Sequence, residues 1–243
     1  MNRRYFFFGS VLAGAVPAAG FGSVPSLRAL GYKPFYDKLN VAAIGCGGQG
    51  TGDLRAMLRA GNVECVALCD VDEGVLRKGV DAQDKKGVKV TPYSDIRKVL
   101  ENKDIDIVSI ATPNHWHSLA AIWAVQAGKD VYCEKPLSHN VWEGRQAVEA
   151  AKKYSKNIVQ AGTQNRSSED IVDAIEFVKS GKIGKILWAR GLCYKPRQSI
   201  GKVAGPTAIP SHIDYDLWCG PSPNQPLMRS KLHYDWHWQF VTG

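Results

Sequence analysis

The sequence predicts an α/β fold with a Rossmann-type doubly wound parallel sheet. Three observations support this fold class. The apolar run 41–44 leads directly into a glycine-rich turn. Strand-like and helix-like segments then alternate as far as residue 161, which is typical of parallel sheets with helical crossovers. The run 105–111 is almost continuously apolar, as in a strand that helices cover on both faces.

Six strands and their connecting helices are expected in order along the chain. The expected strands comprise residues 41–44, 63–68, 88–91, 105–111, 130–133 and 157–161. The first helix starts at the glycine turn, and the later ones comprise residues 72–84, 94–100, 119–127 and 141–153. Ligands of such sheets bind outside the carboxyl ends of the strands, so the loops that follow strands are where functional residues are expected.

The glycine turn after the first strand predicts a dinucleotide site. Gly45, Gly47 and Gly50 stand in G-x-G-x-x-G register, which allows a tight turn, close approach to a pyrophosphate and close packing of a helix on a strand. Asp70 ends the second strand, twenty residues after Gly50, where an acid can bind the ribose hydroxyls. An ordinary strand-turn-helix is the alternative. NAD is expected rather than NADP, because Asp70 would repel a 2′-phosphate.

Three further loops carry unusual residues after the fourth, fifth and sixth strands, at positions 112–117, 134–136 and 162–166. Each loop has an ordinary explanation as a turn proline, a solvated lysine or a polar surface. Because all three lie on the same sheet edge as the glycine turn, together they indicate a functional site.

The motifs Gly45-Cys-Gly-Gly-Gln-Gly50, Ala111-Thr-Pro-Asn-His115 with His117, and Glu134-Lys-Pro136 follow one another at a particular spacing. In this respect the chain resembles the oxidoreductase superfamily named for glucose–fructose oxidoreductase and inositol dehydrogenase (Gfo/Idh/MocA). The resemblance implies an N-terminal NAD(P)-binding domain and a C-terminal α+β open-sheet domain, expected to be incomplete in this chain, that supplies the sugar pocket and the oligomer contacts. It also implies that Lys135 acts on the reacting hydroxyl, and that its peptide bond to Pro136 is often cis.

The resemblance and the loop positions together give the candidate site residues. Lys135 is the expected catalytic residue, as proton acceptor or relay. The expected cofactor-binding residues are Gly45, Gly47, Gly48, Gln49, Gly50, Asp70, Thr112, Pro113, Asn114, His117 and Glu134. The expected substrate contacts are Lys135, Trp116, Asn165 and Arg166, with packing as the alternative role for Trp116.

The second half of the chain is expected to open the substrate domain without completing it. We expect a helix over residues 167–180, a strand over 185–193 and a strand-like segment at 234–238. Proteins of the superfamily that the chain resembles continue past the position of residue 243, with a helix whose histidine partners the catalytic lysine. No residue of this sequence can be assigned that role. The expected domains are therefore 38–162 for the dinucleotide and 163–243 for the start of a substrate and oligomerisation domain. A truncated chain and a functional short form both stay open.

These expectations favour an NAD-dependent oxidoreductase that acts on a secondary hydroxyl of a sugar or cyclic polyol. One alternative is a glycosidase or lyase in which NAD is recycled in place, and another is an inactive nucleotide-binding fragment. The resemblance implies a homo-oligomer if the second domain is complete.

The charge and the cysteines indicate no other class of partner. The 31 basic and 23 acidic side chains give a net charge of +8, but the cations are scattered without a basic run, so no nucleic acid is expected. The six cysteines form no C-x-x-C pair, and no metal is expected. Cys46, Cys65, Cys69 and Cys133 lie in or beside buried strands and are expected to be core residues.

The first 31 residues have the pattern of an export signal. Arg3 and Arg4 precede an apolar stretch rich in small residues, and no acid occurs before Asp37. The arginine pair resembles a twin-arginine signal, although Asn2 stands where Ser or Thr is usual. The expected location is the periplasm, with the cytoplasm as the alternative, and no membrane contact is expected beyond the signal.

Overall fold

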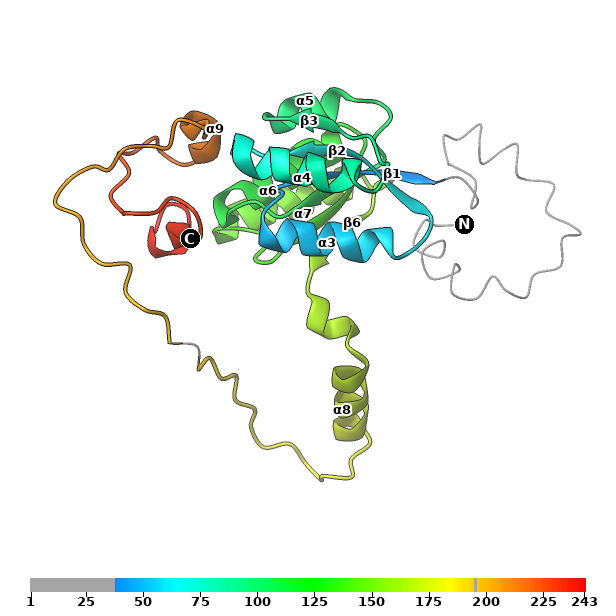
Figure 1. Cartoon of the computed structure of the whole chain (residues 1–243). Helices are drawn as coiled ribbons and strands as arrows, with labels where there is room; N and C mark the ends of the chain where they lie inside the picture. Colours follow the sequence, from blue (N-terminus) through cyan, green and yellow to red (C-terminus); the bar gives the residue numbers. More distant parts are fainter. Residues whose placement is uncertain (1–37, 195) are drawn as a thin grey trace, which may run out of the picture.

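The computed structural model describes residues 38–194 and 196–243, so the expected export signal at 1–31 lies outside the described residues. Six parallel strands form one sheet in the order β3-β2-β1-β4-β5-β6. The strands are β1 (Leu39–Ile44), β2 (Val63–Cys69), β3 (Thr91–Tyr93), β4 (Ile107–Ile110), β5 (Asp130–Glu134) and β6 (Val159–Gly162). The strand order reverses direction between β1 and β4, which confirms the doubly wound fold (Figure 1).

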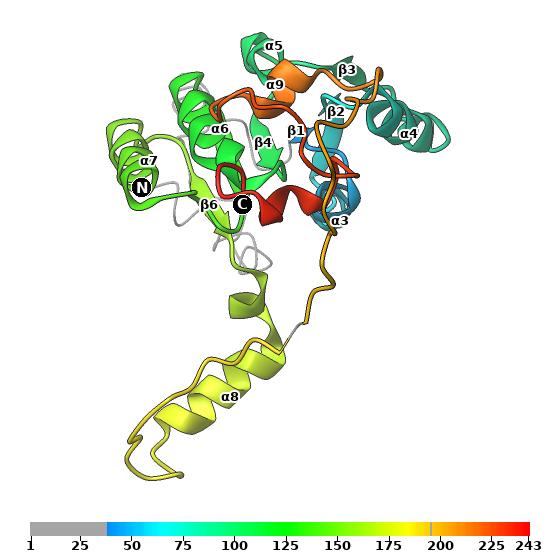
Figure 2. The ribbon, with the colours of Figure 1, turned by 90° about the vertical axis from the view of Figure 1, so that its left-hand side faces the viewer.

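Helices cover both faces of the sheet (Figures 1 and 2). They are α3 (Gly48–Leu58) and α4 (Glu73–Asp84) on one face, and α5 (Ile96–Glu101), α6 (Asn114–Gln126) and α7 (Val141–Lys153) on the other. Successive residues of a strand point to opposite faces. Accordingly, Val41 and Ala43 belong to the apolar cluster beneath α3 and α4. Ala42 and Ile44 belong to the cluster that packs against α6.

Two elements of this unit begin three or more residues away from their predicted starts. The third strand starts at Thr91 rather than residue 88 and contains Pro92. A proline fits there because β3 is an edge strand, whose outer N–H groups have no partner strand. Helix α6 starts at Asn114, five positions before the predicted start, with Pro113 as its N-cap residue. The predicted loop 112–117 is therefore mostly the first turn of a helix.

The second half contains the predicted helix but neither of its predicted strands. Helix α8 (Glu169–Lys179) follows the short 3₁₀ helix η2 (Gln164–Ser167). Residues 185–193 form no strand, because no described segment lies beside them to pair with their N–H and C=O groups. Residues 234–238 form the 3₁₀ helix η3 (Asp235–Trp238), which follows Tyr234 with a φ of 65°.

The last residues of the chain return to the parallel sheet (Figure 2). Helix α9 (Tyr215–Cys219) belongs to a third apolar cluster, in which Val71 packs against residues of the C-terminal segment 210–243. One antiparallel bridge pairs Ile213 with Asp72, just beyond the end of β2. This C-terminal segment therefore covers part of the carboxyl edge of the sheet.

The predicted core role of the four strand cysteines is confirmed, since Cys46, Cys65, Cys69 and Cys133 are buried and unpaired. Within the part of the chain that the structure describes, no helix combines the length and apolar character needed to cross a bilayer. The same residues include no group of three or more metal-ligating side chains placed to hold an ion.

Candidate functional site: the carboxyl edge of the sheet

The glycine turn after β1 is packed so closely that two of its positions exclude a side chain. Gly45 has a φ of +85°, and a Cβ built there would lie 2.7 Å from the carbonyl carbon of Ala111. A Cβ at Gly50 would lie 1.8 Å from the backbone oxygen of Gly45. Around Gly47 and Gly48, in contrast, there is nothing within 4 Å of a built Cβ. The turn is thus sealed against α3 and β4 and open on the side from which a ligand would approach.

The N-terminus of α3 offers donors that suit a diphosphate. The N–H of Thr51 makes the first bond of the helix, 2.9 Å from the oxygen of Gly47. This leaves the N–H groups of residues 48–50 without an intrahelical acceptor, and Gly47 supplies no side-chain cap. Free N–H groups and the positive end of the helix dipole favour a bound anion. The residues present therefore fit the pyrophosphate of a dinucleotide.

Asp70 lies where β2 ends beside this turn. Its Oδ2 accepts a hydrogen bond from the N–H of Cys46 at 2.8 Å, and its Oδ1 accepts one from the N–H of Asp72 at 3.0 Å. Burial raises the pKa of Asp70, while these two N–H donors oppose that shift. Each carboxylate oxygen can accept a second bond, so the carboxylate that fixes the turn can also accept ribose hydroxyls.

Glu134 is the centre of a buried hydrogen-bond network at the end of β5. Its Oε1 accepts hydrogen bonds from the side-chain amide of Gln164, from the Tyr132 hydroxyl at 3.3 Å and from Gln49 Nε2 at 3.5 Å. Its Oε2 accepts one from the backbone N–H of Lys135 at 3.2 Å. Glu134 is a predicted cofactor-binding residue, and in the structure its carboxylate joins β5 to α3 and η2.

One glycine, Gly162, and one carboxyl residue, Asp53, complete this network. A Cβ at Gly162 would lie 2.8 Å from Oε1 of Glu134, so only glycine leaves room for the carboxylate. Asp53 accepts a bond from Gln49 Nε2 at 2.9 Å through Oδ1, while its buried Oδ2 has no partner among the described residues. Burial raises the pKa of Asp53, and the hydrogen bond from Gln49 opposes this shift.

Lys135 itself lies at the carboxyl end of β5 with an exposed side chain. The peptide bond between Lys135 and Pro136 is cis, as the sequence comparison implied. The backbone is anchored on one side by the network of Glu134 and on the other by the carbonyl of Pro136, which contacts Nδ1 of His117 at 2.7 Å. The lysine is thus held on a fixed backbone at the lip of the sheet edge.

Comparison with known proteins agrees with this arrangement. Residues 39–163 match the model of a family described as oxidoreductases with an NAD-binding Rossmann fold, Gfo/Idh/MocA. The chain belongs to this family.

Three relatives illustrate the family's range. Over 180 residues, 74% of this chain and 52% of the relative, the chain is 32% identical to an inositol 2-dehydrogenase of Salmonella typhimurium. Over 204 residues, 77% of this chain and 44% of the relative, it is 29% identical to a glycosyl hydrolase family 109 protein of Shewanella pealeana. The WlbA dehydrogenase of Bordetella pertussis, solved with NADH and UDP-GlcNAcA, has a TM-score of 0.55 at 25% identity, over 61% of this chain and 43% of that one. The chain spans about half the length of the curated relatives it matches.

The family's Thr-Pro-Asn loop is organised by a buried histidine. His117 is 1% exposed, and its Nε2 lies 2.7 Å from the oxygen of Thr112 while its Nδ1 faces Pro136. Burial lowers the pKa of His117, and the two carbonyl acceptors oppose this shift. Both ring nitrogens contact backbone oxygens, so His117, a predicted cofactor-binding residue, ties the loop after β4 to the loop after β5.

Of the other residues in this loop, Trp116 has a packing role. Its indole N–H donates to the oxygens of Leu217 and Trp218 at 3.1 and 3.2 Å. The neighbouring His115 contacts the oxygen of Trp218 through Nε2 at 3.0 Å. Of the two roles considered for Trp116, stacking on a sugar and packing, the structure shows packing against the C-terminal segment.

The remaining candidates differ in how the structure places them. Asn114 opens α6, and the buried Oγ1 of Thr112 has no partner among the described residues. Asn165 and Arg166 are exposed in η2, and neither side chain contacts another described residue through a hydrogen bond. The sequence reasoning chose these two although their neighbour Gln164 is the residue that reaches Glu134.

Proposed function

We propose that the chain is an NAD-dependent oxidoreductase that acts on a secondary hydroxyl of a sugar or cyclic polyol. One observation carries this proposal: Lys135 stands exposed on an anchored backbone at the same sheet edge as the free N–H groups of the glycine turn. A lysine side chain in that position can, as the neutral amine, take the proton of a hydroxyl while the dinucleotide is held beside it.

The chain's own residues would perform three tasks. The N–H groups of residues 48–50 would hold the diphosphate, and Asp70 would bind the adjoining ribose. Glu134 and His117 would position the backbone on both sides of Lys135. Lys135 would accept or relay the proton that leaves the hydroxyl. When bound, NAD supplies the hydride acceptor of such an oxidation.

Two of the similar proteins support the substrate class. One relative is an inositol 2-dehydrogenase, and inositol is a cyclic polyol. One similar solved structure contains NADH together with the sugar nucleotide UDP-GlcNAcA.

Replacement of Lys135 tests the proposal. In the 243-residue chain, Lys135→Met should leave the NAD dissociation constant within about twofold and lower turnover of a polyol panel by more than about 100-fold, because the lysine amine would accept the hydroxyl proton in the transition state. Lys152→Met is the matched control, since Lys152 only pairs with Glu149 on the surface. A wild-type chain that binds NAD without reducing it on any sugar or polyol would contradict the proposal.

The second candidate is glycoside hydrolysis or elimination with NAD recycled in place. The glycosyl hydrolase family 109 relative favours it. This reaction would release sugar from a glycoside without accumulating NADH, whereas the first candidate forms one NADH for each hydroxyl oxidised. Simultaneous measurement of NADH absorbance and released sugar separates the two.

We further propose that NAD is preferred to NADP because Asp70 repels a 2′-phosphate. Asp70→Ser should narrow the difference between the two dissociation constants. Tighter binding of NADP than of NAD by the unmodified chain would contradict this.

The remaining proposals concern location and assembly. Replacing Arg3 and Arg4 together with lysine should retain a reporter fusion in the cytoplasm if residues 1–31 are a twin-arginine signal.

Residues 163–243 are proposed to open the substrate domain, which begins where the family match ends. Light scattering of the purified chain would test the proposed homo-oligomer.

A further inference from the structure

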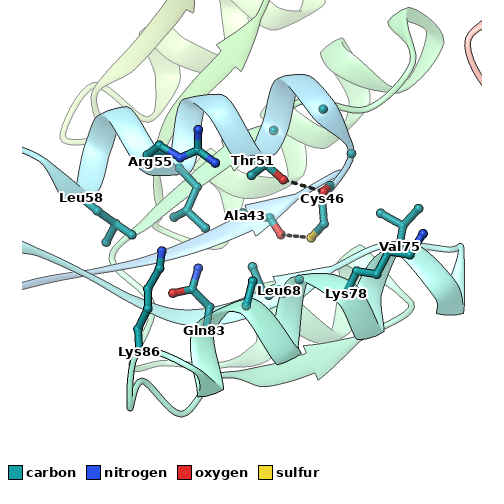
Figure 3. Close-up of a pocket in the computed structure, with 16 residues that line it drawn as sticks. Ala43, Cys46, Thr51, Arg55, Leu58, Leu68, Val75, Lys78, Gln83 and Lys86 are labelled. Atoms are coloured by element: carbon teal, nitrogen blue, oxygen red, sulfur yellow. Dashed lines mark hydrogen bonds between the residues drawn. The ribbon is translucent and has the colours of Figure 1, made fainter.

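A cavity that begins at the glycine turn lies between helices α3 and α4 (Figure 3). Its volume is about 340 Å³, within the range of about 300–1,000 Å³ that small-molecule sites occupy. It borders the glycine turn at Gly47 and Gly48 and extends to Leu58 and Lys86. The carboxyl-edge residues Asp70, Asn114 and Lys135 do not line it. The cavity therefore needs its own explanation.

The floor of the cavity is apolar. Ala43, Leu54, Leu58, Leu68 and Val75 line it. The thiol of Cys46 also faces it, and burial raises the pKa of this thiol to about 12, so it is uncharged at neutral pH. A ligand would therefore meet a surface that suits an alkyl or other apolar body.

The rim of the cavity is cationic. Arg55 on α3, and Lys78 and Lys86 on or just after α4, line it, and no acidic residue does. None of these three side chains forms an ion pair or a hydrogen bond with a described residue. Unpaired cations of one sign around an apolar floor are complementary to an amphipathic anion.

Gln83 points to a ligand independently of the charges. Its side chain is only 6% exposed, lines the cavity and forms no hydrogen bond with any described residue. In Figure 3, Gln83 and Lys86 both extend from the α4 side towards α3. An amide without a protein partner has both its oxygen and its N–H groups free for a ligand. This amide therefore lies where the polar head of a ligand can satisfy it.

We propose that the cavity between α3 and α4 binds a small amphipathic anion, an alkyl body with one carboxylate or phosphate head. The alkyl body lies on the floor over Leu54 and Leu68. The head lies near Gln83 and Lys86, where the amide donates a hydrogen bond and the ammonium an ion pair. This site does not depend on the proposed oxidoreductase function.

Titration of octanoate into the 243-residue chain tests the proposal, with binding followed by calorimetry. Lys86→Gln should weaken octanoate binding roughly two- to fivefold, because Lys86 is exposed and solvent screens its ion pair with the carboxylate. Lys85→Gln is the matched control, because Lys85 is the exposed neighbour that does not line the cavity. Gln83→Leu should also weaken binding, with an unchanged circular dichroism spectrum showing that α4 is intact.

Further ligands test whether binding needs both the charged head and the apolar body. Octanol lacks the charge and inorganic phosphate lacks the apolar body, so each should bind at least about tenfold more weakly than octanoate. Comparison of octanoate with octyl phosphate then distinguishes the two heads. Ala82→Phe should fill the cavity and abolish octanoate binding. Equal binding of octanol and octanoate, or equal effects of Lys86→Gln and Lys85→Gln, would overturn the proposal.

Discussion

Helices α6 and α8 are of similar length, 13 and 11 residues, but they lie in very different surroundings. Helix α6 contributes Ala120, Ala121, Ala124 and Val125 to the core, each at most 3% exposed. Helix α8 has no buried residue, and its Ile171, Val172, Ile175 and Phe177 are 41–50% exposed. Figure 1 shows α8 projecting away from the sheet while α6 packs on it.

The difference shows that an apolar pattern and its burial are separate properties. The sequence of α8 has the periodicity that predicts an amphipathic helix, and the helix forms. Burial additionally needs a second surface, which the sheet provides for α6 and which no described segment provides for α8. The same residue type should therefore contribute very differently to the free energy of unfolding in the sheet with its packed helices and in the segment around α8.

Matched glycine substitutions should show the largest contrast between the regions. Gly50→Ala places a Cβ 1.8 Å from the Gly45 oxygen, so the turn must shift, and we expect a loss of more than about 4 kcal/mol in the free energy of unfolding. NAD binding should be lost with it. Gly191→Ala meets nothing within 4 Å and should change stability by less than about 0.5 kcal/mol. Urea unfolding measures both, and similar midpoints for the two variants would break the comparison.

Matched isoleucine substitutions should give the next largest contrast. Ile110 is fully buried in β4, and Ile110→Ala should cost about 2–5 kcal/mol through lost burial and a cavity. Ile175 on α8 is 48% exposed, and Ile175→Ala should cost less than about 0.5 kcal/mol. A cost above about 2 kcal/mol for Ile175→Ala would mean that α8 is covered in solution, for example by a second copy of the chain.

The contrast also explains which parts of the fold were predictable. The strands β1, β4 and β5 are short and largely buried, and their apolar residues identify them in the sequence. The glycine turn marks the end of β1 and the start of α3. The predicted strand at 185–193 failed because a strand depends on a partner, and residues such as Leu187 and Trp188 have the same apolar character whether or not one is present.

Within the site, the predictable part was the backbone and the unpredictable part was the pairing of side chains. The loops after parallel strands meet at one edge, so Gly45, Asp70 and Lys135 could be placed together. The bond from Gln49 to Glu134 joins residues 85 positions apart, and no local pattern marks it. Asp53 had a weak signal, since it lies one helical turn after Gln49, and so did Tyr132, two positions before Glu134 on the same strand face.

A smaller effect should come from the contact between the C-terminal segment and α6. Gly220 has a φ of +50°, and a built Cβ would lie 2.1 Å from the ring of Trp116. Gly220→Ala should therefore weaken docking of the segment by about 1–3 kcal/mol. Limited proteolysis within residues 210–243 should become faster while NAD binding persists. Gly205→Ala, with nothing within 4 Å, is the control, and equal cleavage rates for both variants would contradict this contact.

The smallest effect should come from the ion pair that joins His233 to Asp72. Asp72 accepts a bond from the N–H of Val75 at 2.9 Å, and its Oδ2 lies 2.7 Å from Nε2 of His233 and 3.6 Å from Nε2 of His212. Burial acts to raise the pKa of Asp72, but these partners outweigh it and the pKa is lowered from 3.8. A lowered pKa means that ionised Asp72 contributes its full stability above pH 3.8 and that this contribution is lost as the pH falls through the folded-state value.

His233→Ala should therefore move the folded-state pKa of Asp72 upward, so that the acid-induced loss begins at a higher pH. The effect should stay below about 1 kcal/mol, because the His233 side chain is 51% exposed and solvent screens the pair. Carboxyl carbon NMR of Asp72 measures the titration directly. His212→Ala serves as the control, since its longer distance predicts a smaller shift. An unchanged Asp72 titration in His233→Ala would show that the N–H of Val75 alone sets this pKa and that the C-terminal segment is not held there in solution.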